Sequence, residues 1–201
     1  MAGPLAFFDG QFRRQLAAGE FALNPFETAA LPHLRGRVLD LGCGLGNLAL
    51  AAGRRGCQVL AVDACASAVG RINRDAAAEG LRVRAVAADL GDYAIEGEYD
   101  TVNCIGLLMF LPRPRALTLL EALQAAVAGG GCAIVNVLVE GTSYLEMFGD
   151  EEYTLFGRGE IAARFAGWRP CLSRIEEFPA PRATRKVFAT VIARKPAGAS
   201  R

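Results

Sequence analysis

A short apolar run that leads into a glycine-rich turn constrains this chain more than any other stretch. Residues 38–47 read Val-Leu-Asp-Leu-Gly-Cys-Gly-Leu-Gly-Asn, and an alanine- and leucine-rich run follows. This order predicts a buried strand, a tight turn and the start of a helix. Glycine is needed where φ is positive or where the backbone passes close to a ligand. Because the first N–H groups of a helix are unpaired and carry partial positive charge, the turn predicts a site for a nucleotide-like cofactor.

The spacing of the glycines separates two classes of cofactor. Dinucleotide-binding turns read G-x-G-x-x-G, whereas this turn reads Asp-x-Gly-x-Gly-x-Gly from Asp40. A carboxylate there would repel a pyrophosphate, but it suits a ligand that carries an ammonium or sulfonium charge. The turn resembles motif I of the class I S-adenosylmethionine (AdoMet) methyltransferases, and the resemblance implies AdoMet as the cofactor. A turn that only packs strand against helix is the alternative.

Length and charge narrow the class of protein and of partner. The chain has 201 residues, enough for one α/β domain with a complete core and too few for two. It is 52% hydrophobic and 21% charged, as soluble globular proteins are. Lys and Arg number 22 against 21 Asp and Glu, so the net charge of +1 gives no electrostatic case for nucleic acid or an anionic membrane. We therefore expect a small-molecule acceptor as the partner.

Targeting signals and metal-ligand patterns are not found in the sequence. Residues 1–14 lack a basic start followed by an apolar run, and no apolar stretch is long enough for a membrane span, so a cytoplasmic location is predicted. The six cysteines never form C-x-x-C, and several lie in apolar strand patterns. This usage favours buried, reduced thiols over disulfides or metal ligands, and no metal is expected.

Strand and helix patterns alternate from Arg37 onwards. Strands are predicted at 38–41, 58–62, 82–88, 99–105, 132–139, 168–178 and 186–194. Helices are predicted at 26–34, 47–55, 66–79, from Pro112 through Val127, and at 158–165. Residues 129–131 and 179–185 are predicted turns. The alternation predicts a doubly wound, seven-stranded, mostly parallel sheet that ends in an antiparallel hairpin.

Two helices carry details that matter for the site. In the helix 66–79, Val69 and Ile72 mark the apolar face, and Arg71, Arg74 and Asp75 mark the polar face. The only histidine, His33, lies near the end of the helix 26–34 and is interpreted as a surface or capping residue rather than a catalyst.

Three segments are predicted along the chain: a helical extension at 1–35, a methyltransferase domain at 36–196 and a disordered tail at 197–201. Aromatic residues give the extension an apolar stripe: Phe7, Phe8, Phe12 and Phe21. Such a segment either lies over the cofactor site as a lid or covers an otherwise exposed apolar face.

Acids at three successive strand ends complete the predicted cofactor site, since ligands of open α/β sheets lie at the carboxyl ends of the strands. Asp63 is placed to accept from the ribose hydroxyls, Asp89 from an adenine amino group, and Asp40 from the amino group of the cofactor. Each acid, taken alone, could instead cap the following helix. The predicted cofactor-binding residues are Asp40, Gly42, Cys43, Gly44, Gly46, Asn47, Asp63, Ala64, Asp89, Leu90, Cys104 and Ile105.

Three later segments resemble the tellurite-resistance methyltransferase family: residues 105–111, 159–168 and 188–195. That resemblance implies methylation of tellurite or selenite oxyanions, or of thiol-like acceptors. The family carries a histidine with arginines before the last strand, whereas residues 176–186 of this chain hold Arg182, Arg185 and Lys186 but no histidine. The acceptor site is predicted to involve Phe8, Phe110, Arg182 and Arg185, and a solvated hairpin turn is the alternative for the two arginines.

The sequence therefore predicts an AdoMet-dependent methyltransferase for a small acceptor, with a chalcogen oxyanion or a thiol as the first hypothesis. No Ser-His-Asp set or carboxylate pair stands out, so no catalytic residue is assigned; methyl transfer depends mainly on alignment and desolvation. An AdoMet-binding sensor without turnover is the main alternative, and a dinucleotide-dependent oxidoreductase is the third.

Overall fold

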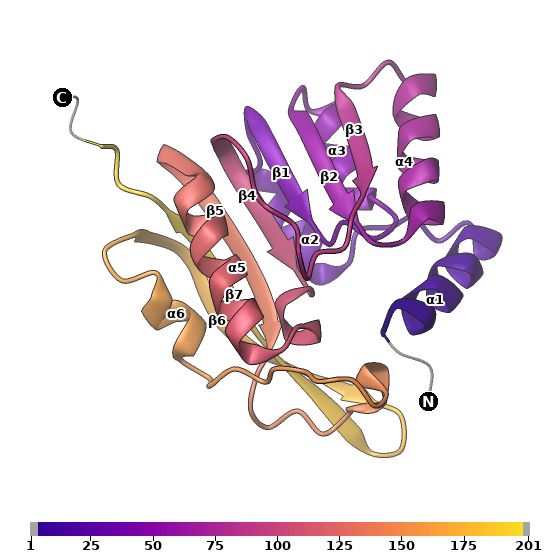
Figure 1. Ribbon diagram of the computed structural model, residues 1–201, viewed down its shortest axis with the longest axis vertical. Helices are drawn as coiled ribbons and strands as arrows, with labels where there is room; N and C mark the ends of the chain where they lie inside the picture. The colour runs from indigo at the N-terminus through magenta and orange to yellow at the C-terminus, as the bar shows by residue number, and fades with distance from the viewer. Residues whose placement is uncertain (1–3, 199–201) are drawn as a thin grey trace.

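Seven strands form a single sheet in the computed structural model, which describes residues 4–198 (Figure 1). Their order is β3-β2-β1-β4-β5-β7-β6; β1 to β5 pair in parallel, and β7 is antiparallel to both β5 and β6. The strands are β1 (Arg37–Leu41), β2 (Gln58–Asp63), β3 (Val83–Ala87), β4 (Tyr99–Ile105), β5 (Val127–Leu138), β6 (Arg169–Ala180) and β7 (Thr184–Arg194). The predicted doubly wound sheet with a closing antiparallel hairpin is confirmed.

Helices cover both faces of the sheet, which explains why its central strands are apolar throughout. Leucines of α5 and Ile161 of α6 belong to the core on one face, which is turned towards the viewer in Figure 1. Ala30, Leu48 and Ile72 bring α2, α3 and α4 into the core on the other face. The helices are α1 (Pro4–Ala18), α2 (Pro25–Ala30), α3 (Asn47–Arg54), α4 (Ala66–Ala78), α5 (Arg113–Ala126) and α6 (Glu160–Arg164), with 3-10 turns η1 (Leu31–His33), η2 (Leu108–Phe110) and η3 (Glu146–Phe148).

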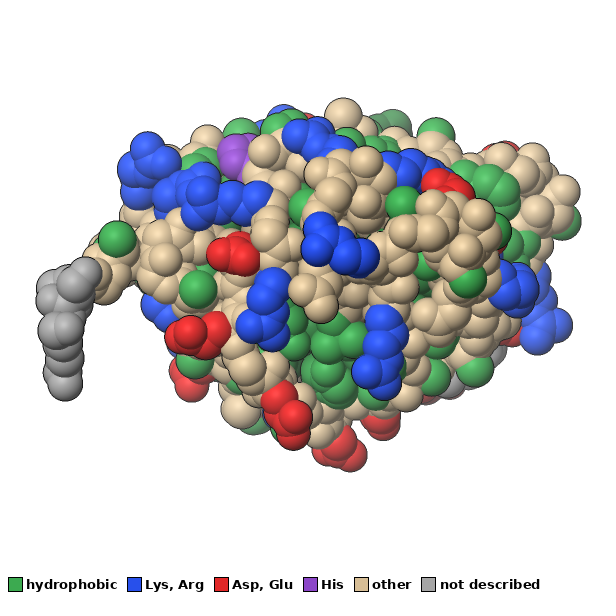
Figure 2. All heavy atoms as spheres, turned by 90° about the horizontal axis from the view of Figure 1, so that it is seen from above, with side chains coloured by type: hydrophobic (Ala, Val, Ile, Leu, Met, Phe, Trp, Pro, Cys, Tyr) green, Lys and Arg blue, Asp and Glu red, His purple; other side chains and the backbone are tan. Residues whose placement is uncertain are grey.

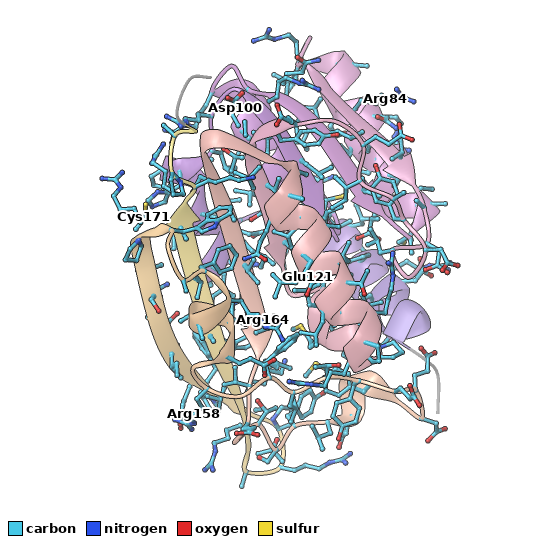
Figure 3. The ribbon with its side chains drawn as sticks, turned by 60° about the vertical axis from the view of Figure 1, so that its left-hand side comes forward. Arg84, Asp100, Glu121, Arg158, Arg164 and Cys171 are labelled. Carbon is cyan, nitrogen blue, oxygen red and sulfur yellow. The ribbon has the colours of Figure 1, made fainter. Side chains whose placement is uncertain are left out.

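Polar contacts fix the sheet and its covering helices at their ends. The Asp100 carboxylate accepts a hydrogen bond of 2.8 Å from the backbone N–H of Arg37, so β4 holds the start of β1. Between α5 and α6, Oε1 of Glu121 and Nη1 of Arg164 form an ion pair at 3.7 Å (Figure 3). Contacts of this exposed kind contribute at most about 1 kcal/mol each, so the apolar cores provide most of the stability.

Two predicted boundaries are wrong for identifiable reasons. The helix predicted at 26–34 ends at Ala30, because Pro32 has no N–H for the next helical bond, and a 3-10 turn follows. Val127 was predicted on the face of the preceding helix, but it begins β5 and pairs with Tyr99. The glycines at 129–131, predicted as a separate turn, lie inside β5, where the register with β4 is irregular.

The closing hairpin is longer and its turn tighter than predicted. Ala180 pairs with Thr184, and both Arg182 and Ala183 between them have positive φ, at 59° and 57°. Pro179 lies within β6, where a proline is tolerated because β6 is the outer strand of the sheet.

The cysteines are free thiols and mostly buried, as their places in apolar strand patterns predict. All six cysteines are free thiols; five are buried and Cys171, on the outer strand β6, is half-buried (Figure 3). Among the described residues, no cluster of three or more His, Cys, Asp or Glu side chains could hold a metal ion, and no helix within 4–198 is long and apolar enough to span a membrane.

Figure 2 shows Lys and Arg side chains dispersed over one face, with Asp and Glu gathered mainly along one rim. Most of the predicted tail at 197–201 lies outside the described residues.

One glycine of the turn after β1 gives a stability test. Gly46 has φ 73°, and a Cβ built on it would lie 2.3 Å from Cγ1 of Ile72. Gly80 has a similar φ of 65° with nothing near its Cβ position, so it is a matched control for backbone strain alone. We expect Gly80→Ala to lower the free energy of unfolding by about 1 to 2 kcal/mol, and Gly46→Ala by about 1 to 3 kcal/mol more, because it also overpacks the core. Equal losses in urea titrations would contradict this account.

Candidate cofactor and acceptor site

The turn after β1 is held open by its glycines. Gly42, Gly44 and Gly46 all have positive φ, at 70°, 51° and 73°. The turn is tied to β2, since the N–H groups of Gly42 and Cys43 both donate to the carbonyl of Val62, at 2.8 and 3.2 Å. The alternating glycines are therefore required by backbone conformation, and the bare backbone forms one wall of the site.

The three predicted acids meet at one edge because β1, β2 and β3 are neighbours in the sheet. Asp63 uses both carboxylate oxygens locally: Oδ2 accepts from the N–H of Gly44 and Oδ1 from the N–H of Cys65, each at 2.8 Å. Asp89 is exposed, and its Oδ1 accepts from the N–H of Gly91 at 2.8 Å. Asp63 thus joins the glycine turn to the start of α4.

Asp40 is the most perturbed acid of the site. It is 3% exposed, and its Oδ1 accepts from Nδ2 of Asn103, its register partner on β4, at 2.5 Å. Burial raises the pKa of Asp40 to about 7, the Asn103 hydrogen bond opposes the rise, and the charges of Glu27 and Asp63 add to it. Glu27, on α2, also has a raised pKa because of burial, opposed by the N–H of Asn24. A cation or hydrogen-bond donor placed here would be strongly favoured.

Buried polar groups continue from Asp40 across the sheet. On β5, Nδ2 of Asn136 donates to Oγ1 of Thr190 on β7 at 2.9 Å. Within the described part of the chain, the carboxamide oxygens of Asn103 and Asn136 find no donor. This side of the sheet is therefore rich in hydrogen-bond acceptors, a chemistry that favours donors and cations over anions.

The remaining predicted cofactor residues surround the same edge. Oδ1 of Asn47 is already occupied, because it accepts from Nη1 of Arg71 at 2.9 Å. Cys104 is fully buried, and burial raises the pKa of its thiol to about 12, so it is not a nucleophile at neutral pH. Burial likewise raises the pKa of the Cys43 thiol well above its ordinary value. Leu90 is buried, Ile105 half-buried and Ala64 exposed.

Helix α1 lies beyond the carboxyl ends of β1 to β3 (Figure 1). A Cβ on Gly44 would lie 3.1 Å from the Phe12 ring, so this ring rests on the glycine turn. The Asp9 carboxylate accepts from Oγ of Ser67 at 3.2 Å and from the Cys65 thiol at 3.5 Å, which fastens α1 to the start of α4.

The predicted acceptor residues separate into two groups. Phe8 and Phe110 come together, with ring centroids 5.0 Å apart in an edge-to-face arrangement. Arg182 is exposed and forms an ion pair of 2.5 Å with Glu146, and Nε of Arg185 donates to the carbonyl of Gly141 at 2.9 Å. The arginines lie around the hairpin turn, and each already has a partner.

Three residues at this site were missed by sequence reasoning. Asn103 and Glu27 face Asp40, and Arg71, predicted on the polar face of its helix, is buried at 6% exposed. A polar residue inside the apolar run of β4 was a signal for Asn103. For Glu27 and Arg71 no local pattern was available, because their burial depends on how helices pack on the sheet.

The mostly parallel sheet with a glycine turn after β1 defines a Rossmann-like fold. A family profile described as a methyltransferase domain matches residues 38–131. The ubiquinone biosynthesis O-methyltransferase of Paraburkholderia xenovorans (strain LB400) is 30% identical over 163 residues, covering 72% of this chain and 69% of that protein.

Two solved structures share the fold. TehB from Haemophilus influenzae superposes with a TM-score of 0.75 at 19% identity, over 90% of this chain and 65% of that one. The 1,6-didemethyltoxoflavin-N1-methyltransferase of Burkholderia thailandensis, solved with S-adenosylhomocysteine (AdoHcy), has a TM-score of 0.68 at 24% identity, over 98% and 92%. At these identities the likeness concerns the fold alone.

The chain belongs to the class I AdoMet-dependent methyltransferases. The predicted cofactor and enzyme class are confirmed.

The raised pKa of Asp40 predicts a pH-dependent affinity for AdoHcy. Because Asp40 becomes charged as pH rises through about 7, its attraction for the ammonium group of the ligand should appear over the same range. We expect the affinity to rise from pH 6 to pH 8, with proton release near pH 7 measurable by calorimetry in buffers of different ionisation enthalpy. In the ligand-free protein the sign is opposite: a carboxyl whose pKa rises on folding from 3.8 to about 7 lowers stability as pH rises across that range.

The control for this prediction is Asp40→Asn, which cannot titrate. Its AdoHcy affinity should be weaker at pH 8 and should change little between pH 6 and pH 8. The same pH dependence in the variant and the wild type would assign the proton to another group.

Proposed function

We propose that this methyltransferase acts on a small, planar aromatic acceptor that presents a thiol or another readily deprotonated N–H or O–H group. The observation that carries the proposal is a chain of rings at the proposed acceptor end. The ring centroids of Phe8 and Phe110 lie 5.0 Å apart, those of Phe110 and Phe148 lie 5.1 Å apart, and Phe148 is stacked on Tyr153 at 4.3 Å. We call these four residues the aromatic group. Tyr153 is 40% exposed, so the group reaches the surface and is not merely part of the core. Offset and edge-to-face contacts with such rings suit a planar ligand.

We propose that the parts of the cofactor lie along the sheet edge in the order of the strands β3, β2 and β1. AdoMet fits the site chemically, because the acceptor-rich surface around Asp40 favours hydrogen-bond donors or cations. Asp89 would receive the adenine amino group, Asp63 the ribose hydroxyls and Asp40 the ammonium group. Continuing past β4 in the sheet order, the next positions belong to the acceptor.

When bound, AdoMet supplies a methyl group already activated on a sulfonium centre. The contribution of this chain is therefore to orient the acceptor and to exclude water. The residues from 106 to 111 carry no titratable side chain. Because the three phenylalanines of the aromatic group supply no general base, the acceptor should lose its proton readily by itself, as thiols and acidic N–H or O–H groups do.

An oxyanion acceptor, which together with a thiol was the first hypothesis from the sequence, would need a cation to hold it, and three basic residues lie around the hairpin turn. Arg182 and Arg185 are already engaged, whereas Lys186 has no ion-pair partner among residues 4–198. Its Nζ lies 4.8 Å from the centre of the Tyr144 ring, and burial lowers its pKa. A second candidate function is therefore methylation of an anion held by Lys186.

Four variants separate these functions in an acceptor screen that detects transferred methyl by mass. If the acceptor is aromatic, Phe110→Ala or Phe8→Ala should raise its KM about tenfold, since each removes a ring contact and apolar area. The Arg182→Ala/Arg185→Ala double variant and Lys186→Gln should then be nearly silent. Selenite or tellurite methylation that is lost in Lys186→Gln or the double variant, while AdoHcy affinity is kept, would support an oxyanion and overturn the aromatic acceptor.

Asp63 is expected to act on cofactor affinity in two ways. Asp63→Ala should cost about 2–4 kcal/mol of AdoHcy binding, because it removes a charge-assisted acceptor and releases the N–H of Gly44. Asp63→Asn keeps one oxygen and should cost less. Calorimetry in which both variants bind as wild type would leave Asp63 with a structural role only.

A further inference from the structure

Arg71 of α4 is a buried cation with four partners, of which two belong to the glycine turn after β1. Its Nη1 donates to the carbonyl of Leu45 at 2.8 Å and to Oδ1 of Asn47 at 2.9 Å, and its Nε donates to Asp75 at 3.0 Å. The ring of Phe21 lies over the guanidinium at 3.9 Å from its centroid. A buried charge is costly unless it is paired and hydrogen-bonded, so these contacts explain why an arginine is tolerated here.

The contacts fall on both sides of a critical glycine. Leu45 and Asn47 flank Gly46, which has a left-handed conformation and caps α3 without any side-chain hydrogen bond. Asp63 holds the turn two residues before Gly46, through the N–H of Gly44. The turn is therefore held by an anion from β2 and by a cation from α4.

We propose that Arg71 is a positioning residue that keeps the 45–47 segment in its cofactor-binding conformation, and that Phe21 strengthens this action by covering the guanidinium. One nitrogen of the guanidinium, Nη1, donates to both groups of the turn, while Nε of the same rigid plane donates to Asp75, and an ammonium group cannot reproduce this combination. Through Phe21, the segment that follows α1 is coupled to the same turn. The proposal rests on the cofactor site of the family and is independent of the acceptor.

The test measures AdoHcy affinity by calorimetry at a temperature where every variant is folded. Arg71→Met keeps the apolar bulk of the side chain and loses the donors, and we expect its Kd to rise about tenfold. Arg71→Lys should lie between this variant and the wild type. The matched control is Arg74→Met, which removes an exposed arginine of the same helix and should leave the Kd unchanged.

Phe21 gives a second arm through a double-mutant cycle. Phe21→Leu should raise the Kd about two- to threefold in the wild-type background, as a cation–π contact of this kind implies, and should have no effect on Kd in the Arg71→Met background. If Arg71→Met does not fold, Arg71→Lys and Phe21→Leu carry the test. A lower melting temperature with a wild-type Kd in Arg71→Met, or in both Arg71→Lys and Phe21→Leu where Arg71→Met does not fold, would show a purely structural role and overturn the proposal. Additive effects of Phe21→Leu and Arg71→Met would overturn the part assigned to Phe21.

Discussion

The hydrogen bond from the N–H of Gly44 to Asp63 is the contact on which the site depends. It joins the turn after β1 to the end of β2, and the second oxygen of the same carboxylate accepts from the start of α4. One side chain therefore sets the distance between the glycine turn and the next helix. Because Gly44 must keep a positive φ to present its N–H in this direction, the glycine and the acid form one structural unit.

Hydrogen-bond acceptors and acids dominate the face of the sheet on which Asp40 lies. Asp40 is buried beside Asn103 and faces Glu27, and the polar contacts continue to Asn136 and Thr190. Burial of a carboxylate beside further acids is unfavourable in the ligand-free protein, which is why the pKa of Asp40 is raised. A cationic ligand beside Asp40 would relieve this repulsion, so we expect the buried acid to contribute to the affinity for the cofactor.

The strands and the glycine turn could be predicted because their signals are local. Apolar runs of strand length and glycine at alternate positions need no knowledge of distant residues. Val127 was misplaced because the helical spacing of Leu117, Leu120 and Leu123 continues through it, whereas its pairing with Tyr99 is a long-range contact. Strand pairing of this kind overrides local periodicity.

The candidate site was predictable in its backbone and less so in its side chains. The three acids reach one edge because their strands are neighbours, as the alternation implies. Arg71 was assigned to the polar face of its helix, yet Phe21 and the turn bury it. Arg185 lies on the same face of β7 as the buried Val187, and its guanidinium donates to the carbonyl of Gly141. Whether an arginine faces solvent, a ligand or a carbonyl depends on tertiary packing that no short pattern contains.

Helix α1 contacts both the glycine turn and the aromatic group. The Phe12 ring rests on the glycine turn. Phe8, one helical turn earlier, contacts Phe110 at the proposed acceptor end. We expect a ligand that comes between Phe12 and Gly44 to displace α1 and so to disturb the Phe8 contact as well. Asp9 of the same helix accepts hydrogen bonds from Ser67 and Cys65, so displacing α1 would also break these contacts. We therefore expect that binding at one end of the site changes the walls of the other.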